Sequence, residues 1–175
     1  MTLILNRRTL IRLQRYNDGQ ILTESIMSYI VYNGHLSLIK YYYHNTNIKN
    51  ILYFLYYIDI AASYNHLNIV KWLHYNICRG CTKHAMDIAA DKGHLDIIIW
   101  LHNNRTEGCS SNAIIWASEN GHYNVVKWLN VHKPCCTTEK SIIMSINVAY
   151  SEGHNDIKQY LERQYPQHKY FKNFE

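Results

Sequence analysis

The sequence predicts an all-α protein built from a row of about five similar helix-turn-helix units. The first observation is the dipeptide Gly-His, which recurs at positions 34, 93, 121 and 153, with Asn-His at 65. Its intervals are 65 − 34 = 31, 93 − 65 = 28, 121 − 93 = 28 and 153 − 121 = 32. The second is that apolar residues recur at fixed, helical distances from each dipeptide. A period in this range indicates a repeat array, in which each unit buries its apolar side against its neighbours.

The dipeptides themselves are expected to be structural, because every unit has one. They are Gly34, His35, Asn65, His66, Gly93, His94, Gly121, His122, Gly153 and His154. Glycine and asparagine adopt at low cost the left-handed backbone conformation that ends many helices. We therefore expect each Gly or Asn to end one helix and each histidine to serve the turn, not catalysis or metal binding.

Residues on either side of each turn predict one helix before it and one after it. Within one unit Ala85, Ile88 and Ala89 stand at i, i+3 and i+4, which places them on one helix face. The segment from Leu95 to Leu101 has few polar positions, as expected for a second helix packed between neighbours. The recurrent positions are Ile30, Ala61, Ala89, Ala117 and Ala149 before the turn, and Tyr42, Leu73, Leu101, Leu129 and Leu161 after it.

The segment from Ala89 to Ile98 resembles the part of an ankyrin repeat that joins its two helices, and the match recurs five times. The longer string from Gly93 to Cys109, with Trp-Leu-His and Gly-Cys in it, is similar to a variant in ankyrin families of giant viruses and some eukaryotic microbes. The resemblance covers residues 21–165. It implies an ankyrin-like helical solenoid, in which the histidine ties the inter-helix turn through hydrogen bonds.

The units depart from the family pattern in length. The central units have 28 residues, against about 33 in an ankyrin unit that begins Thr-Pro-Leu-His. Here the first helices begin Thr82-Lys83-His84-Ala85 or Ser111-Asn112-Ala113. The missing length falls between the second helix of one unit and the first helix of the next, where the family projects a β-hairpin. We expect shortened loops there.

The array has expected boundaries. Residues 1–20 are expected to be an N-terminal capping segment, residues 21–165 the repeat array and residues 166–175 a C-terminal tail. The units are placed at 21–47, 48–80, 81–108, 109–136 and 137–165. In the last unit Asn155 and Lys158 replace apolar residues, which predicts a cap that faces water. Four arginines (Arg7, Arg8, Arg12 and Arg15) precede the first acidic residue, so an amphipathic targeting peptide is an alternative for the first segment.

Composition excludes several classes of protein. With 47% hydrophobic and 18% charged residues the chain is too apolar to be disordered. Its densest apolar run is about half of the ~20 residues that span a membrane, so we expect a soluble intracellular protein, in the cytoplasm (the host cytoplasm if the protein is viral).

The positive charge is concentrated at the N-terminus. Residues 1–20 hold four Arg and one Asp, 4 − 1 = +3 of the net +5, which leaves +2 for the rest. Since a nucleic-acid binder carries a basic stripe on its folded surface, nucleic acid is not the expected partner.

The cysteines raise the possibility of a metal site. Cys78 and Cys81 have the spacing of half a zinc site, and His84 is close in sequence. However, Cys81 and Cys109 are 28 apart and each follows a glycine, which is typical of a repeated loop residue. An odd number of cysteines without an export signal predicts reduced thiols. No cofactor, metal or catalytic motif is expected. The alternative function is a nucleic-acid-associated or metal-binding protein that uses the basic N-terminus or Cys78 and Cys81.

Two tyrosine-rich runs, residues 41–43 and 53–57, suit either the core of the first units or a binding patch. We interpret them as core, with Tyr43 and Tyr53 the most exposed.

The most informative positions for function are the two residues before each turn, because they change from unit to unit. They are Tyr32, Asn33, Ser63, Tyr64, Asp91, Lys92, Glu119, Asn120, Ser151 and Glu152. In proteins of this resemblance such a strip lies at the edge of the concave face and contacts the partner. We therefore expect a non-catalytic, monomeric scaffold that binds an unidentified protein partner through the concave face. The alternative is that these residues are merely solvated helix ends.

Overall fold

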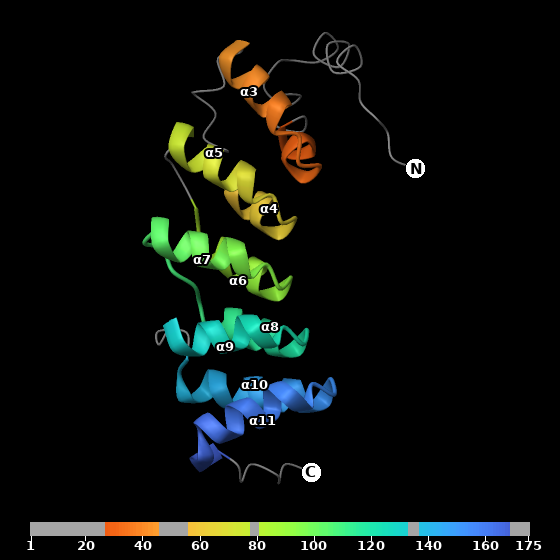
Figure 1. Cartoon of the computed structure of the whole chain (residues 1–175), viewed down its shortest axis with the longest axis vertical. Helices are drawn as coiled ribbons and strands as arrows, with labels where there is room; N and C mark the ends of the chain where they lie inside the picture. Colours follow the sequence, from red (N-terminus) through yellow and green to blue (C-terminus); the bar gives the residue numbers. More distant parts are fainter. Residues whose placement is uncertain (1–26, 46–55, 78–80, 133–136, 169–175) are drawn as a thin grey trace. The chain divides into compact units, whose positions relative to one another are not determined.

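The computed structural model describes residues 27–45, 56–77, 81–132 and 137–168, which are helical and contain no strand. The helices come in pairs joined by tight turns (Figure 1). A helix over residues 27–32 precedes α3 (Leu36–Asn45), and α4 (Tyr57–Ser63) precedes α5 (Leu67–Ile77). The next pairs are α6 (Lys83–Asp91) with α7 (Leu95–Asn104), α8 (Asn112–Glu119) with α9 (Tyr123–His132), and α10 (Glu139–Ser151) with α11 (Asn155–Gln164). The fold class predicted from the sequence, a helical repeat protein, is confirmed.

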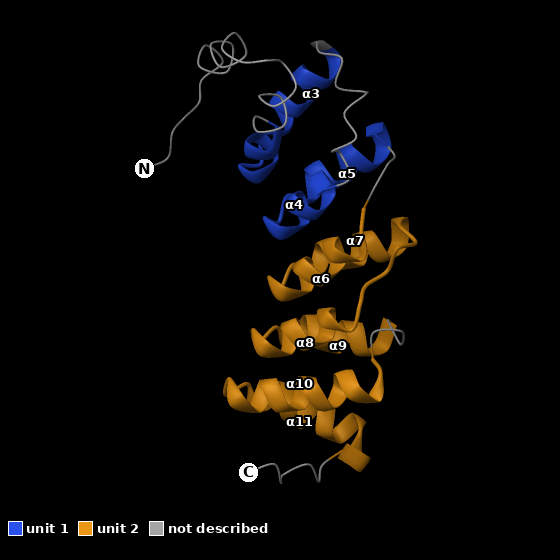
Figure 2. Cartoon of the chain, turned by 180° about the vertical axis from the view of Figure 1, so that it is seen from behind, with its two compact units in different colours: residues 1–80 blue, residues 81–175 orange. Residues whose placement is uncertain are grey.

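The chain divides into two compact units, residues 1–80 and 81–175, which Figure 2 colours separately. This division coincides with the boundary expected between the second and third repeats. In unit 2 the first helix of each pair packs on its own second helix, and α8 lies between α6 and α10. The predicted capping segment lies outside the described residues. The expected tail begins with a short 3-10 helix, η4 (Pro166–His168), which packs against α11.

Each turn closes with a backbone hydrogen bond from the histidine N–H, and the turns at Gly34, Asn65, Gly93 and Gly153 add a second bond from the N–H of the residue before the histidine. After α6, the His94 N–H donates to the Ala89 carbonyl at 2.8 Å and the Gly93 N–H to the Ala90 carbonyl at 3.2 Å. This is a Schellman motif, which needs a left-handed residue just past the helix end. The dipeptide's first residue supplies it in all five turns, with φ between 75° and 82° at four glycines and 59° at Asn65. Each of these residues therefore stands in the left-handed conformation just past the end of its first helix.

The turn histidine bonds to the preceding turn. His66 Nε2 lies 3.0 Å from the Tyr32 carbonyl in unit 1, and in unit 2 His122 Nε2 lies 2.9 Å from the Asp91 carbonyl. His154 repeats the bond at 3.0 Å from the Glu119 carbonyl. Because a carbonyl can only accept, each ring donates from Nε2. The histidine therefore joins successive repeats, in addition to standing in its own turn.

The glycine of the preceding turn makes room for this ring. A Cβ on Gly34 would lie 2.6 Å from His66 Cε1, and one on Gly121 would lie 2.6 Å from His154 Cε1. At Gly153, in the last repeat, nothing lies within 4 Å of the same point. Glycine is thus required twice at the inner turns, for its backbone conformation and for the close approach of the imidazole.

The recurrent apolar positions form the core. Ile30, Ala61, Ala89, Ala117 and Ala149, four before each turn, have 0% exposure. At the eighth position after the turn the side chains are also buried, namely Tyr42, Leu73, Leu101, Leu129 and Leu161. Small residues on the first helices let neighbouring pairs approach closely, and the larger ones fill the space behind them.

The loop between α7 and α8 is short and is fixed by a buried carboxylate. Asp87, 4% exposed, accepts hydrogen bonds from Ser110 N at 2.8 Å and Ser110 Oγ at 2.7 Å. Ser110 Oγ in turn accepts from Asn112 N at 3.1 Å, which caps the start of α8. Burial raises the pKa of Asp87, and the two bonds from Ser110 partly offset that rise. No strand is found in residues 105–111, in agreement with the shortened loops.

One expectation about the loops is wrong. Cys109 is disulfide-bonded, whereas reduced thiols were expected. Cys81, 28 residues earlier, is a buried thiol whose Sγ donates to the Thr82 carbonyl at 3.4 Å. Cysteine number and spacing could not reveal this bond, because they do not say which loops meet in space.

Candidate partner-binding surface

In unit 1 the strip before the turns is aromatic and uncharged. Tyr32 and Tyr64 are 50% and 45% exposed, and their ring centroids lie 4.2 Å apart. Asn33 is half-buried and donates to the Tyr29 carbonyl at 2.8 Å, while Ser63 is half-buried. The two predicted tyrosines therefore form one exposed aromatic pair that joins successive turns.

In unit 2 the same strip is polar and mostly acidic. Asn120 Nδ2 donates to Asp91 Oδ1 at 2.9 Å, so side chains of successive turns again touch. Lys92 forms an exposed ion pair with Asp91 at 2.9 Å. Glu119 and the pair Ser151 and Glu152 are exposed, and the Ser151 hydroxyl donates to the Val148 carbonyl at 3.0 Å. Four of the six predicted residues here thus offer charge to a partner.

A second set of residues on the first helices is also accessible, and sequence reasoning did not include it in the site. Five positions before each turn stands an apolar or aromatic side chain that is half-buried. These residues are Tyr29 and Ile60 in unit 1, and Ile88, Trp116 and Val148 in unit 2. They lie about one helical turn before the strip, so both sets share one face of the first helices.

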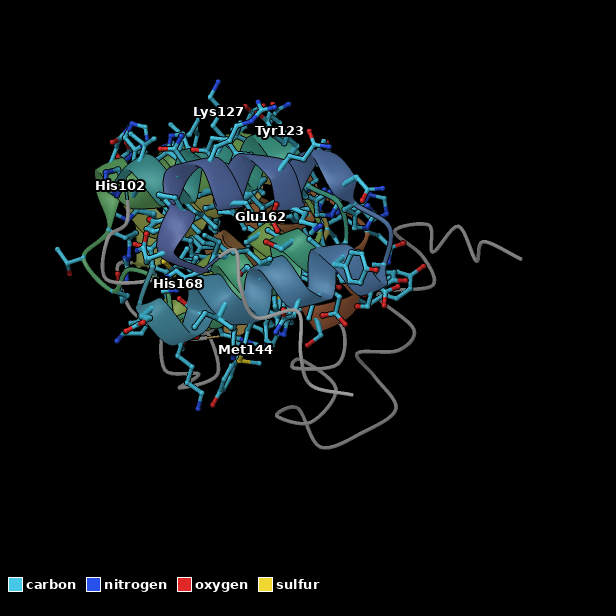
Figure 3. The ribbon with its side chains drawn as sticks, turned by 90° about the horizontal axis from the view of Figure 1, so that it is seen from below. His102, Tyr123, Lys127, Met144, Glu162 and His168 are labelled. Carbon is cyan, nitrogen blue, oxygen red and sulfur yellow. The ribbon has the colours of Figure 1, made fainter. Side chains whose placement is uncertain are left out.

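The face in unit 2 includes one more large apolar residue, Met144, which is 42% exposed. Figure 3 shows Met144 on α10 pointing away from the unit on the side opposite to Tyr123 and Lys127 of α9. Trp116 has His84 beside it, with ring centroids 6.5 Å apart. The first helices of this unit therefore present tryptophan, methionine and aliphatic side chains on a face separate from that of the second helices.

The tyrosine-rich runs fit the core interpretation in part. Tyr42 and Tyr57 are buried. Tyr43 is half-buried, not the most exposed residue of its run: its hydroxyl donates to the Asn76 carbonyl at 3.1 Å and its ring packs edge-on against Trp72. Tyr41 is the more exposed, at 37%. Tyr53 lies outside the described residues.

The described ranges contain no assembled metal site. No group of three or more His, Cys, Asp or Glu side chains there could hold a metal ion. Cys78 lies outside these ranges, and Cys81 is buried. The basic N-terminal segment, on which the nucleic-acid alternative depends, also lies outside them. Within the described residues no helix has the length and apolar character to cross a lipid bilayer.

The comparisons with known proteins agree with the geometry. A family model described as ankyrin repeats (3 copies) matches residues 58–140. No curated protein matches the chain. Ankyrin repeats are generally modules of protein-protein interaction and are typically non-catalytic. The helix pairs closed by Gly-His turns, together with this match, show that residues 58–140 are ankyrin repeats.

Proposed function

We propose that the chain is a non-catalytic scaffold that binds a partner protein through the face of its first helices, the concave face of an ankyrin stack. The observation that carries the proposal is the half-exposed apolar residue on each first helix, placed one turn before an exposed residue that varies. The backbone beneath is rigid, since Schellman turns and histidine bonds fix it in both units. A preformed face loses little entropy on binding.

The anchors of such an interface are expected to be Trp116 in unit 2 and the pair Tyr32 and Tyr64 in unit 1. Aromatic residues dominate binding energy at interfaces because they bury a large area with few rotatable bonds. The partner is expected to be a protein met in the cytoplasm, with the chain itself monomeric. No step of this proposal uses a metal or a cofactor.

The test compares affinity capture from cell extract by the unaltered chain and by two variants, Trp116→Ala and the double variant Tyr32→Ala with Tyr64→Ala. The matched control is Lys127→Ala, on the opposite face of unit 2. We expect each aromatic variant to lose a partner that the control retains. Urea unfolding of each variant ensures that losses do not reflect unfolding. Recovery of the same proteins by all four chains would refute binding through this face.

A further inference from the structure

Each first helix of unit 2 carries a carboxylate one turn after its half-buried apolar residue. Ile88 is followed by Asp91, Trp116 by Glu119, and Val148 by Glu152. Side chains three or four positions apart lie on the same helix face, so each carboxylate stands beside the apolar side chain. Three successive helices thus repeat one pair, an apolar contact next to a negative charge.

The turns of unit 2 add to this charge. Asp96 and Asp156 are exposed in the first turns of α7 and α11, immediately after the strip. Residues 91–96, 119–124 and 151–156 together hold five carboxylates and one lysine, 1 − 5 = −4, in a chain whose formal net charge is +5. The lysine, Lys92, already pairs with Asp91. The turn edge of this unit therefore has a negative potential that an approaching cation would feel.

The turn does not require these charges. The corresponding residues of unit 1, 32–37 and 63–68, contain no Asp, Glu, Lys or Arg. Their turns nevertheless make the same backbone bonds, such as His35 N to the Ile30 carbonyl at 3.0 Å. A structural need for acid at the turn would apply to both units, so the carboxylates of unit 2 are not required by the turn and are available for binding.

We propose that this face of unit 2 binds a cationic segment of the partner protein, in which apolar or aromatic side chains alternate with Lys or Arg. The inference rests on the proposed function and specifies the partner's chemistry. Apolar side chains of the segment cover Ile88, Trp116 and Val148, while its cations meet Asp91, Glu119 and Glu152. An arginine can also stack on the Trp116 ring, since guanidinium groups pack well on aromatic faces.

The spacing of the helices suits an extended segment. Packed helices lie roughly 10 Å apart, and an extended chain advances about 3.3 Å per residue. A segment that crosses α6, α8 and α10 would therefore meet a new apolar and acidic pair about every three residues. Nucleic acid does not fit this face, because its phosphates would meet the same carboxylates.

The first step of the test selects peptides from a random library displayed on phage, with the full chain as target at low salt. We expect the enriched peptides to combine Lys or Arg with Leu, Ile, Phe or Trp. The best peptide is then labelled, and its affinity is measured by fluorescence anisotropy. Its affinity should fall as salt rises, because these charge pairs are exposed to solvent.

Two double variants with equal changes of net charge separate local from general electrostatics. Glu119→Gln with Glu152→Gln removes two carboxylates from the proposed face. Asn103→Lys with Gln159→Lys adds the same +2 at exposed positions of the second helices, α7 and α11. We expect the first variant to bind the peptide roughly five- to tenfold more weakly, and the second within about twofold of the unaltered chain. All four substitutions replace exposed side chains, so folding is retained.

The outcomes distinguish this inference from the function on which it rests. If enriched peptides lack cations but bind more weakly to Trp116→Ala, the cationic chemistry is wrong and binding through the face stands. If the selected peptide binds the unaltered chain, Trp116→Ala and the Gln variant equally well, the cationic inference and binding through this face are both wrong. Failure to enrich any peptide would also count against both. Displacement of the peptide by a DNA oligonucleotide of random sequence would overturn the cationic inference.

Discussion

The turns of the two units have the same backbone and different side chains. Gly34 in unit 1 and Gly121 in unit 2 have φ of 76° and 75°, and each receives the ring of the following turn's histidine. On this common frame unit 1 places two tyrosines in ring contact, and unit 2 places Asp91 with Asn120. The fold therefore tolerates aromatic or acidic residues at the same place.

The chemistry of the histidine bond explains this tolerance. The ring donates to the main-chain carbonyl of the residue two before the preceding glycine, which is Tyr32, Asp91 or Glu119. A main-chain acceptor is the same whatever side chain the residue bears. The repeats can therefore be held together by one bond while the exposed side chain at that point is free to serve binding.

The largest expected effect concerns the shared frame. Gly121→Ala forces a left-handed backbone on a residue with a Cβ, and the Cβ would lie 2.6 Å from His154 Cε1. Backbone strain of about 1–2 kcal/mol and crowding of about 1–3 kcal/mol should together lower the free energy of unfolding by roughly 2–5 kcal/mol. Urea unfolding measures the loss.

The matched control is Gly153→Ala, which has the same sign of φ and open space at the Cβ. It should cost the backbone strain alone, about 1–2 kcal/mol. Equal losses of unfolding free energy in the two variants would mean that the close approach of the histidine ring is not a reason for glycine at this position.

A smaller loss is expected at the buried carboxylate that fixes the loop between α7 and α8. Asp87→Ala removes the acceptor for both hydrogen bonds of Ser110 and leaves a partly buried N–H unsatisfied. The free energy of unfolding should fall by about 1–3 kcal/mol. Asp87→Asn, which retains an acceptor for Ser110 N, should lose less. Equal losses for Ala and Asn would show that the hydrogen bonds are not the cause.

The pH dependence of Asp87 distinguishes it from the exposed acids of the strip. Burial raises its pKa above the ordinary 3.8, so the folded state favours the protonated carboxyl. Its contribution to stability is therefore full below the ordinary pKa and is lost as the pH rises through the raised pKa. Unfolding free energies from pH 3 to 7 should show the unaltered chain losing stability relative to Asp87→Asn as pH increases. The opposite slope would contradict a raised pKa.

The exposed pairs of the two turn edges should differ in their response to salt. A double-mutant cycle on Tyr32 and Tyr64, each changed to Ala, should give a coupling of about 0.5–1.5 kcal/mol that salt barely changes. The same cycle on Asp91 and Asn120 should give about 0.5–1 kcal/mol, which declines with salt because Asp91 is charged and solvent-accessible. A tyrosine coupling that decreases with salt as the other does would undermine the distinction between the two edges.

Sequence reasoning found what repeats and missed what depends on neighbours in space. The buried alanines and left-handed glycines could be predicted because every unit must satisfy the same packing and turn geometry. Trp116 could not be placed on the proposed binding face, since a half-buried apolar residue and a core residue have the same helical spacing. The carboxylates one turn further on, Asp91 and Glu119, were included because they vary.

Contacts between repeats leave weaker signals in the sequence than the packing within each repeat. The acceptor of the turn histidine is a main-chain carbonyl, which no residue type marks. Tyr43 was expected to be among the most exposed tyrosines, but Trp72 of the next repeat packs against it. Local periodicity determines the faces of a helix, and the neighbouring repeat determines which of these faces stays accessible.

The smallest expected effect tests whether variation always indicates function. Ser145 on α10 stands where α6 and α8 have Ala85 and Ala113, yet it is fully buried, and its hydroxyl has no hydrogen-bond partner among the described residues. Ser145→Ala should raise the free energy of unfolding by up to about 1 kcal/mol, because it removes an unsatisfied hydroxyl and favours the helix.

The control is Ser118→Ala. The Ser118 hydroxyl donates to the Ile114 carbonyl at 2.7 Å, so its removal should not raise the free energy of unfolding. If Ser145→Ala is more stable and its affinity for the peptide is unchanged, variation between repeats indicates function only at exposed positions. The serine at this buried position would then be a small loss of stability that the fold tolerates. A loss of stability in Ser145→Ala would instead mean that the hydroxyl has a hydrogen-bond partner. The serine would then stabilise the interior of the last repeat.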